Sequence, residues 1–418
     1  MKLTKIKTIL QDYSLLLEDK HKLITEINTY ISKSENINEG ELLLKKIINY
    51  LNSEEELQIN QRIEDYFDNK LIGLSLFSNV GIAELYSEEY VNFRVSNELL
   101  KDRANFQREM YPKTNVIQGD ILTKDIFNEV IAYSQKINVD FIMATPPCQG
   151  MSLAGKMEED DPRNKLIIKV VEAIKIIQPK YFLIENVSKM PDTYIIFNQN
   201  KIKIKDFLQE ELSGMYHINI DILNAKDFGT PQSRRRAFVL GSLKEFREWE
   251  SPTKKEKEIT VRDAIEYLPS LESGEASLIP YHYAKKHNKR HIKWMTHTPS
   301  GKTSHHNKIH FPQKEDGTKI KGFDTTYKRI SWDKPAPTIT MANGSVSSQN
   351  NVHPGRKKDD DTYSDARVLT LKEIFILTGL PDKWSPPDSA SEGMIRKVIG
   401  EGVPPKLIEA LLKTIPKD

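Results

Sequence analysis

Short apolar runs alternate with amphipathic stretches of helical length through the middle of the chain. Seven runs have the composition of buried strands: LIGLSLF (starting at residue 71), VNFRVS, NVIQGD, DFIMATPP, YFLIENV, INIDIL and RAFVLG. Residues 164–178 between two of them place six apolar side chains on one helical face: Leu166, Ile167, Val170, Val171, Ile174 and Ile177. This alternation predicts an α/β fold with a doubly wound, mostly parallel sheet and helices on both faces. Ligands bind such sheets beyond the carboxyl ends of the strands.

The pattern differs at both ends of the chain. Residues 1–70 contain no proline and only one glycine, and their apolar residues recur at helical spacing, so we predict an N-terminal helical extension. Residues 71–250 form the predicted sheet domain. The alternation then stops, and we predict a second, smaller domain over residues 251–385. Residues 386–418 include PPKLIEALLKTI, which predicts a C-terminal helix that returns to the sheet domain.

Composition narrows the class of protein. Hydrophobic residues make up 38% of the chain and charged residues 29%, which is typical of a soluble globular protein. Neither a membrane-spanning apolar run nor a signal-peptide pattern is visible, so we expect an intracellular protein in the cytoplasm. The single cysteine excludes an intrachain disulfide and a multi-cysteine zinc site.

The net charge of +2 says little about partners, but its distribution does. Tyr281 to His310 holds seven Lys or Arg residues and seven of the ten histidines, with no acidic residue. The stretch is poorly patterned for a core. A solvated basic loop is one interpretation, and a surface that faces a polyanion is the favoured one. We predict phosphate contacts from Lys285, Lys286, Lys289 and Arg290. A histidine-rich metal site is a weaker alternative because no regular ligand spacing is present, and we expect no metal.

The only cysteine, Cys148, follows a predicted strand and two prolines, Pro146 and Pro147. Proline restricts the backbone, so the thiol stands at a stiff turn on the ligand-binding edge of the sheet. A buried structural cysteine is the alternative, although such a residue is expected inside the strand. Thiolate is the reactive form, and nearby positive charge would favour it.

A series of motifs in fixed order resembles the DNA (cytosine-5)-methyltransferases of bacterial and phage restriction-modification systems. Pro147-Cys148-Gln149 is similar to the family's nucleophile motif, and Glu185-Asn186-Val187 to its Glu-Asn-Val. LNAKDFGTPQSRRRAF resembles the Gln-x-Arg-x-Arg motif, with Gln232, Arg234 and Arg236 in the named places. RVLTLKEIFILTGLPDKW and IGEGVPPKL resemble the two closing motifs. The resemblance covers residues 75 to 408 and implies a Rossmann-like catalytic domain that uses S-adenosylmethionine, together with a target-recognition domain.

The resemblance also implies a cofactor site that releases S-adenosylhomocysteine. FSNVG stands where the family has Phe-x-Gly-x-Gly. Glu98 would bind the ribose and Asp120 the adenine amino group. Phe77 and Ile121 would sandwich the adenine ring, and simple core packing is the alternative for these two side chains. The full set is Phe77, Ser78, Asn79, Gly81, Ile82, Glu98, Leu99, Asp120, Ile121, Pro147, Glu401 and Val403. Three positions depart from the family: Ser75 replaces Asp, Asn79 replaces Gly, and Glu401 replaces Asn. Asn tolerates the positive φ that such a turn requires.

The implied mechanism is covalent. Cys148 would add to carbon 6 of a flipped-out cytosine and make carbon 5 nucleophilic. Glu185 would donate a proton to ring nitrogen 3, and Arg236 would hold the carbonyl oxygen at position 2. Arg234 would position a loop or a phosphate. Gln149 joins the catalytic group, and Ser152, Gln232 and Thr338 join the DNA contacts. A salt-bridge cluster is the alternative for the arginines.

Two other functions remain open at the level of sequence. One is an RNA (cytosine-5)-methyltransferase on the same scaffold, against which stands the long stretch before Arg367. The other is an inactive DNA-binding relative, for which Ser75 and Glu401 are the only support. We expect double-stranded DNA as partner and, at the level of the family, a restriction endonuclease that acts on the same site.

Overall fold

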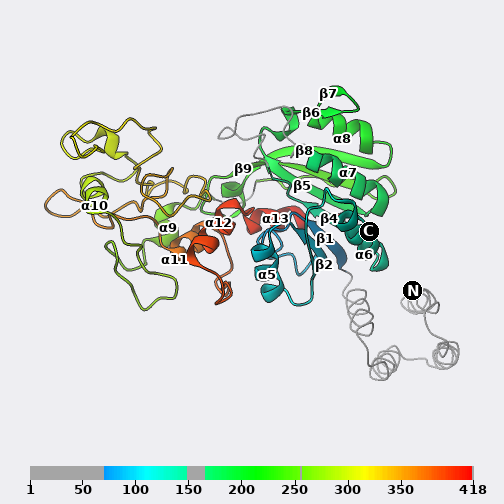
Figure 1. Cartoon of the computed structure of the whole chain (residues 1–418), viewed down its shortest axis with the longest axis horizontal. Coiled ribbons are helices and arrows are strands. Elements are labelled where there is room, and N and C mark those ends of the chain that lie inside the picture. Colours follow the sequence, from blue (N-terminus) through cyan, green and yellow to red (C-terminus); the bar gives the residue numbers. More distant parts are fainter. Residues whose placement is uncertain (1–69, 148–164, 255–256, 417–418) are drawn as a thin grey trace, which may run out of the picture. The chain divides into compact units, whose positions relative to one another are not determined.

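The computed structural model describes residues 70–147, 165–254 and 257–416 (Figure 1). The chain divides into two compact units, Met1–Asn69 and Lys70–Asp418. The predicted N-terminal helical extension lies outside the described residues, apart from Lys70, so it stays a prediction. The description below concerns the second unit.

A seven-stranded sheet forms the centre of this unit, with strand order β3-β2-β1-β4-β5-β9-β8. Each predicted strand run is found, as β1 (Leu71–Leu76), β2 (Val91–Glu98), β3 (Asn115–Gln118), β4 (Phe141–Ala144), β5 (Tyr181–Val187), β8 (Tyr216–Asn224) and β9 (Arg235–Leu243). The first five strands pair in parallel. β9 runs antiparallel to both of its neighbours, β5 and β8. The mostly parallel sheet is therefore confirmed, with one reversed strand.

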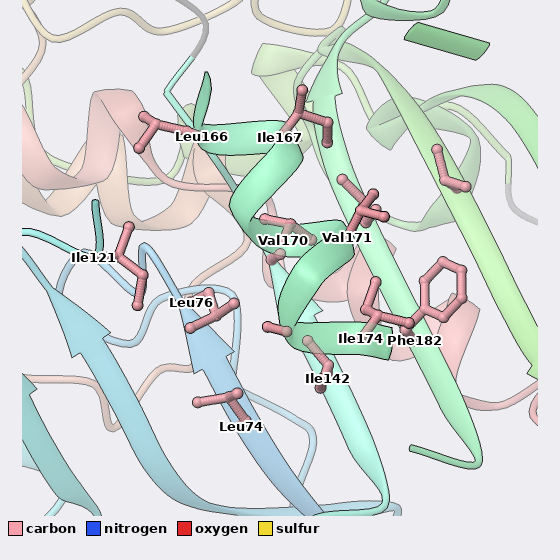
Figure 2. Packing of buried hydrophobic residues seen from close by; sticks show 14 of the residues in the cluster. Leu74, Leu76, Ile121, Ile142, Leu166, Ile167, Val170, Val171, Ile174 and Phe182 are labelled. Carbon is pink, nitrogen blue, oxygen red and sulfur yellow. The ribbon is translucent and has the colours of Figure 1, made fainter. Parts of the chain in front are cut away.

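Side chains alternate between the two faces of the sheet, as strand geometry requires. On β4, Ile142 and Ala144 enter one hydrophobic cluster, whereas Phe141 and Met143 enter another. The first cluster is covered by α6 (Lys124–Lys136), α7 (Lys165–Ile177) and α8 (Ile204–Leu212), and Figure 2 shows α7 lying against the strands. The second is covered by Trp249 and α13 (Pro405–Leu412). The C-terminal helix thus packs on the sheet, and the sheet is covered by helices on both faces.

A further cluster joins the first turn of the sheet to elements that follow residue 250. It contains Val80 and Ile82, Phe106 from α5 (Lys101–Met110), and buried residues of α9 (Val261–Ile265), α11 (Leu371–Thr378) and α12 (Glu392–Glu401). Short 3-10 helices also lie at Met190–Asp192, Ala225–Phe228 and Ser304–His306. A separate hairpin, β6 (Tyr194–Phe197) and β7 (Asn200–Lys203), was not predicted.

The histidine-rich stretch contributes to a core, which corrects the prediction that it does not. Trp294 and Met295 on α10 (Lys289–Thr296) are buried and pack with Val346, Val352, Ala366 and Val368. His282 is also buried, and its ring nitrogens lie 3.0 Å from Thr370 Oγ1 and 2.9 Å from the Pro269 carbonyl. The other face of the same stretch remains charged.

Buried ions stabilise the junction between this core and α11. Arg367 is fully buried and donates to both carboxylate oxygens of Glu373 at 2.9 Å and to Asp365 at 2.9 Å. Burial opposes ionisation of Glu373, but the charges of Arg367 and His353 and the hydrogen bonds from Arg367 and Thr370 together outweigh it and lower the pKa of Glu373 to about 2. Burial also lowers the pKa of the neighbouring His353 to about 3. Since an unpaired buried charge is costly, these residues fix one arrangement of the junction.

No helix within the described residues is long and apolar enough to cross a membrane.

Candidate active site

The ends of four strands come together at one edge of the sheet. β1, β4 and β5 are parallel, so their carboxyl ends share this edge. β9 runs the other way, and Val187 at the end of β5 is paired with Arg236 near the start of β9. The reversed strand therefore brings its arginines to the edge where ligands bind in such sheets.

Glu185 and Arg236 form a largely buried ion pair at this edge. Arg236 Nε lies 2.9 Å from Glu185 Oε1, and the two side chains are 16% and 8% exposed. Burial raises the pKa of the Glu185 carboxyl, and the charges of Arg236 and Arg234 partly oppose that rise. A carboxyl whose pKa is raised in this way holds its proton to higher pH than a solvated carboxyl and can give that proton to a ligand.

Asn186 ties the end of β5 to the turn that leads to the cysteine. Its buried side chain donates to the Pro146 carbonyl at 3.0 Å. Pro146 is buried, whereas Pro147 is exposed. The proline pair thus emerges from the sheet beside Glu185. Cys148, Gln149 and Ser152 lie outside the described residues, so their predicted roles stay predictions.

The turn after β1 has an unusual backbone. Phe77, Asn79 and Gly81 all have positive φ, at 59°, 55° and 80°. An added Cβ at Gly81 would lie 2.4 Å from the Tyr111 ring, so this position requires glycine. Asn79 occupies the left-handed region as expected for a glycine substitute. Backbone strain of this kind is often found where a chain must fit closely around a ligand.

Glu98, at the end of β2, fixes this turn in place. Its carboxylate accepts from the Asn79 and Leu100 backbone N–H groups, each at 2.9 Å. Burial raises its pKa. The next side chain, Leu99, is 55% exposed and offers an apolar surface beside a carboxylate. Ser78 connects the turn to α5, because its hydroxyl donates to Gln107 Oε1 at 2.8 Å.

The remaining predicted cofactor residues are spread along the same edge. Asp120 is exposed after β3, and one of its carboxylate oxygens accepts from Leu122 N at 2.9 Å. Ile121 is buried in the sheet's main cluster, and the half-buried Phe77 packs against that cluster, so the core-packing interpretation holds for both side chains. Ile82 and Val403 are buried as well. A role of these residues toward a ligand stays a prediction.

Sequence reasoning missed one acidic residue near the turn. The buried Ser75, which replaces the family's Asp, donates through its hydroxyl to the carboxylate of Glu84. Burial raises the pKa of Glu84 to about 7. A carboxyl group therefore lies against position 75 although it comes from a residue further along the chain. Only the fold brings the two together.

Gln232, Arg234 and Thr338 join the sheet to the segment that precedes α11. Gln232 is 1% exposed, and its Oε1 accepts from Ile339 N at 3.2 Å. Arg234 donates to the Ile339 carbonyl at 3.0 Å and to the Glu401 carbonyl at 3.1 Å. The Thr338 hydroxyl donates to the Ser233 carbonyl at 2.9 Å. All three side chains make contacts within the protein, and their contact with DNA or substrate stays a prediction.

The four basic residues that we predicted to bind phosphate are all exposed: Lys285, Lys286, Lys289 and Arg290. Lys293, one helical turn after Lys289 on α10, is exposed on the same face and was not predicted. Arg290 lies 3.7 Å from Glu315, an exposed pair that water screens. These side chains are accessible to a polyanion. The same part of the chain shows no metal site, and none of the described residues form a cluster of three His, Cys, Asp or Glu side chains that could hold one.

Comparison with known proteins decides the family. The profile described as C-5 cytosine-specific DNA methylase matches residues 71–417. The chain belongs to this family. This methyltransferase is 45% identical over 351 residues to the Type II methyltransferase M1.HgaI of Avibacterium volantium, and the alignment covers 82% of this chain and 98% of that protein. It is 30% identical over 350 residues to M1.HphI of Haemophilus parahaemolyticus, across 82% and 86% of the two chains.

A solved structure agrees in fold. An E. coli prophage protein assigned as a DNA modification methyltransferase superposes with a TM-score of 0.61 at 21% identity, over 82% of this chain and 98% of that one. The methyltransferase described here methylates carbon 5 of cytosine in DNA, and enzymes of its family in general take the methyl group from S-adenosylmethionine.

Proposed function

We propose that this methyltransferase flips a cytosine out of a specific double-stranded DNA sequence and attacks it with Cys148. The observation that carries the proposal is the arrangement at the ends of β4 and β5. Asn186 holds the Pro146 carbonyl at 3.0 Å, and Arg236 holds Glu185 at 2.9 Å. The chain therefore reaches Cys148 two residues beyond a fixed point beside a carboxyl of raised pKa.

Each protein group has a defined task in the reaction. The Cys148 thiolate adds to carbon 6 and forms a carbon–sulfur bond, while the protonated Glu185 gives its proton to ring nitrogen 3. The electron pair released into the ring makes carbon 5 nucleophilic. Arg236, with a second guanidinium nitrogen beyond the one on Glu185, would bind the oxygen at position 2. After methylation, loss of the carbon 5 proton expels the thiolate and restores the aromatic ring.

The turn at residues 77–81 and the Glu98 carboxylate fit the cofactor that the family uses. S-adenosylmethionine supplies an electrophilic methyl group and leaves as S-adenosylhomocysteine. Glu98 would accept from the ribose hydroxyls, and Asp120 from the adenine amino group. The exposed Leu99 and the half-buried Phe77 give apolar contact area beside these acids. The reaction needs no metal ion.

The setting follows from the relatives. Two of them, at 45% and 30% identity, are Type II methyltransferases, so we assign this enzyme to a type II restriction-modification system. Its partner would be a restriction endonuclease that cuts the same site when unmethylated. The exposed basic residues of 285–293 would bind the DNA backbone.

The Cys148→Ser variant tests the covalent step. We expect no transfer of tritiated methyl groups to duplex DNA, with DNA binding in a gel-shift assay retained. A duplex that carries 5-fluorocytosine should trap the unaltered enzyme as a denaturant-resistant complex, because fluorine cannot leave as the proton does. Normal turnover or trapping by the variant would overturn the proposal. Transfer RNA as substrate and bisulfite sequencing of host DNA would show whether DNA is the substrate and which site is methylated.

A further inference from the structure

We propose that Arg103 is a positioning residue for the cofactor site, because its ion pair with Glu401 clasps the two sides of the turn at residues 77–81 and steadies Glu98. This inference rests on the proposed cofactor site. Neither the sequence motifs nor the relatives assign a role to Arg103. It also accounts for the acid at position 401, where the family has Asn.

The two partners come from elements that flank the turn. Arg103 lies in the first turn of α5, directly after β2 and Glu98, and Glu401 is the last residue of α12. Arg103 Nη2 lies 2.5 Å from Glu401 Oε2, and the side chains are 14% and 27% exposed. The pair is thus half-shielded from water, which strengthens it relative to a surface pair.

Asn79, like the ion pair, connects the end of β2 and the start of α5 on one side of the turn with α12 on the other. Its backbone N–H donates to Glu98 at 2.9 Å, and its side-chain amide donates to the Val398 carbonyl of α12 at 2.9 Å. The turn is therefore held from both sides, by β2 and by α12. The clasp between Arg103 and Glu401 keeps those two sides at a fixed separation.

Helix electrostatics argues that each partner is placed for the other. A cation in the first turn of a helix and an anion in the last turn both oppose the helix dipole. Arg103 and Glu401 occupy these unfavourable positions on α5 and α12. Neither of these two charges stabilises its own helix, so their benefit lies in the contact between the helices.

Arg103 also acts on Glu98. Burial raises the pKa of Glu98, the Arg103 charge lowers it, and the Glu401 charge raises it. The Arg103 charge therefore partly offsets the effect of burial and favours the ionised form of Glu98. Removal of Arg103 would leave two acids facing each other across the turn.

Charge reversal in the full chain tests the clasp, with binding of S-adenosylhomocysteine measured by calorimetry. We expect Arg103→Glu to raise the Kd roughly tenfold, or about 1.4 kcal/mol. The double variant Arg103→Glu/Glu401→Arg should recover most of the affinity. In methyl transfer, Arg103→Glu should raise KM for S-adenosylmethionine and leave kcat at saturation close to the unaltered value.

Lys175→Glu is the matched control. It reverses an ion pair of 2.8 Å between α7 and α8, with Lys175 in the last turn of α7. In a parallel strand–helix unit, that end of the helix lies at the opposite edge of the sheet. Whatever its effect on thermal stability, this variant should leave the Kd unchanged.

The outcomes separate the clasp from the cofactor site itself. If Glu98→Ala abolishes binding while both Arg103→Glu and the double variant bind like the unaltered enzyme, the clasp is wrong and the site stands. If Glu98→Ala also binds normally, the cofactor site is wrong. A lower melting temperature for Arg103→Glu with an unchanged Kd shows a purely structural pair and overturns the inference.

Discussion

Replacement of Arg236 by Ala should impair catalysis while the fold stays intact. The lost contact is a charge-assisted hydrogen bond of 2.9 Å to Glu185, shielded from water on both sides. Such bonds contribute about 1.5–3 kcal/mol. If the Glu185 carboxyl loses its orientation to the same extent in the transition state, kcat/KM falls about 10- to 150-fold.

Methyl transfer to duplex DNA at saturating cofactor measures this loss. Arg235→Ala is the control, because Arg235 is the neighbouring arginine on the same strand, its side chain is exposed, and its carbonyl, which Arg236 contacts, remains in the variant. We expect Arg235→Ala to stay within about threefold of the unaltered enzyme. Equal losses in both variants, or no loss in Arg236→Ala, would refute the assignment of Arg236.

The pH dependence of stability gives an independent measure of the same contact. Glu185 has a raised pKa in the folded protein, so its ionisation costs stability as pH rises from the unfolded value toward the folded one. Without Arg236 the folded pKa rises further, and this loss extends to higher pH. The difference in unfolding free energy between Arg236→Ala and the unaltered enzyme should therefore be larger at pH 8 than at pH 5. A difference that does not depend on pH would contradict the ion pair.

Four further predictions concern other parts of the molecule. The folded pKa of Glu373, about 2, lies below its usual value of 4.5. The ionised Glu373 therefore contributes fully to the free energy of unfolding above pH 4.5, and this contribution is lost as pH falls toward 2. The folded pKa of His353, about 3, lies below its usual value of 6.5, so its contribution to the free energy of unfolding is lost as pH falls below 6.5. In urea unfolding, the stability of His353→Gln should therefore depend less on pH between pH 6.5 and 4.5. Gly81→Ala should lower stability by about 1–3 kcal/mol in thermal melting, because φ is +80° and the Tyr111 ring blocks the added carbon; an unchanged melting temperature would show that the turn rearranges. The last variant replaces four basic residues by Ala: Lys285, Lys286, Lys289 and Arg290. In DNA titrations the slope of log K against log salt concentration should become smaller in magnitude by about 3 to 4. An unchanged slope would show that these residues do not contact phosphate.

Most of the sheet could be predicted because burial imposes a simple pattern on it. Runs such as FIMA in β4 are buried on both faces, so their composition alone identifies a strand. The hairpin of β6 and β7 was missed because its turn gives no strong signal. Asn198 and Gln199 both adopt positive φ, yet Gln stands where glycine usually marks such a turn.

The site could be predicted only as far as residues cluster along the sequence. Glu185 and Arg236 follow from motifs at strand ends. The partnership of Ser75 with Glu84, and that of Arg103 with Glu401, depends on elements that the fold brings together, and no local pattern encodes it. The buried face of α10 could not be predicted from the sequence for a related reason. Trp294 and Met295 are set among lysines and histidines that cover the other face of a single short helix.

The joint between the sheet and the segment before α11 has a consequence for how new specificities arise. Arg234 and Gln232 hold that segment through the backbone carbonyl and N–H of Ile339, groups that any amino acid except proline offers in this position. The attachment therefore does not depend on which side chains the segment carries. With the DNA-reading role proposed for this segment, natural variation or an exchange of the segment between relatives would change the target sequence and leave the catalytic residues in place.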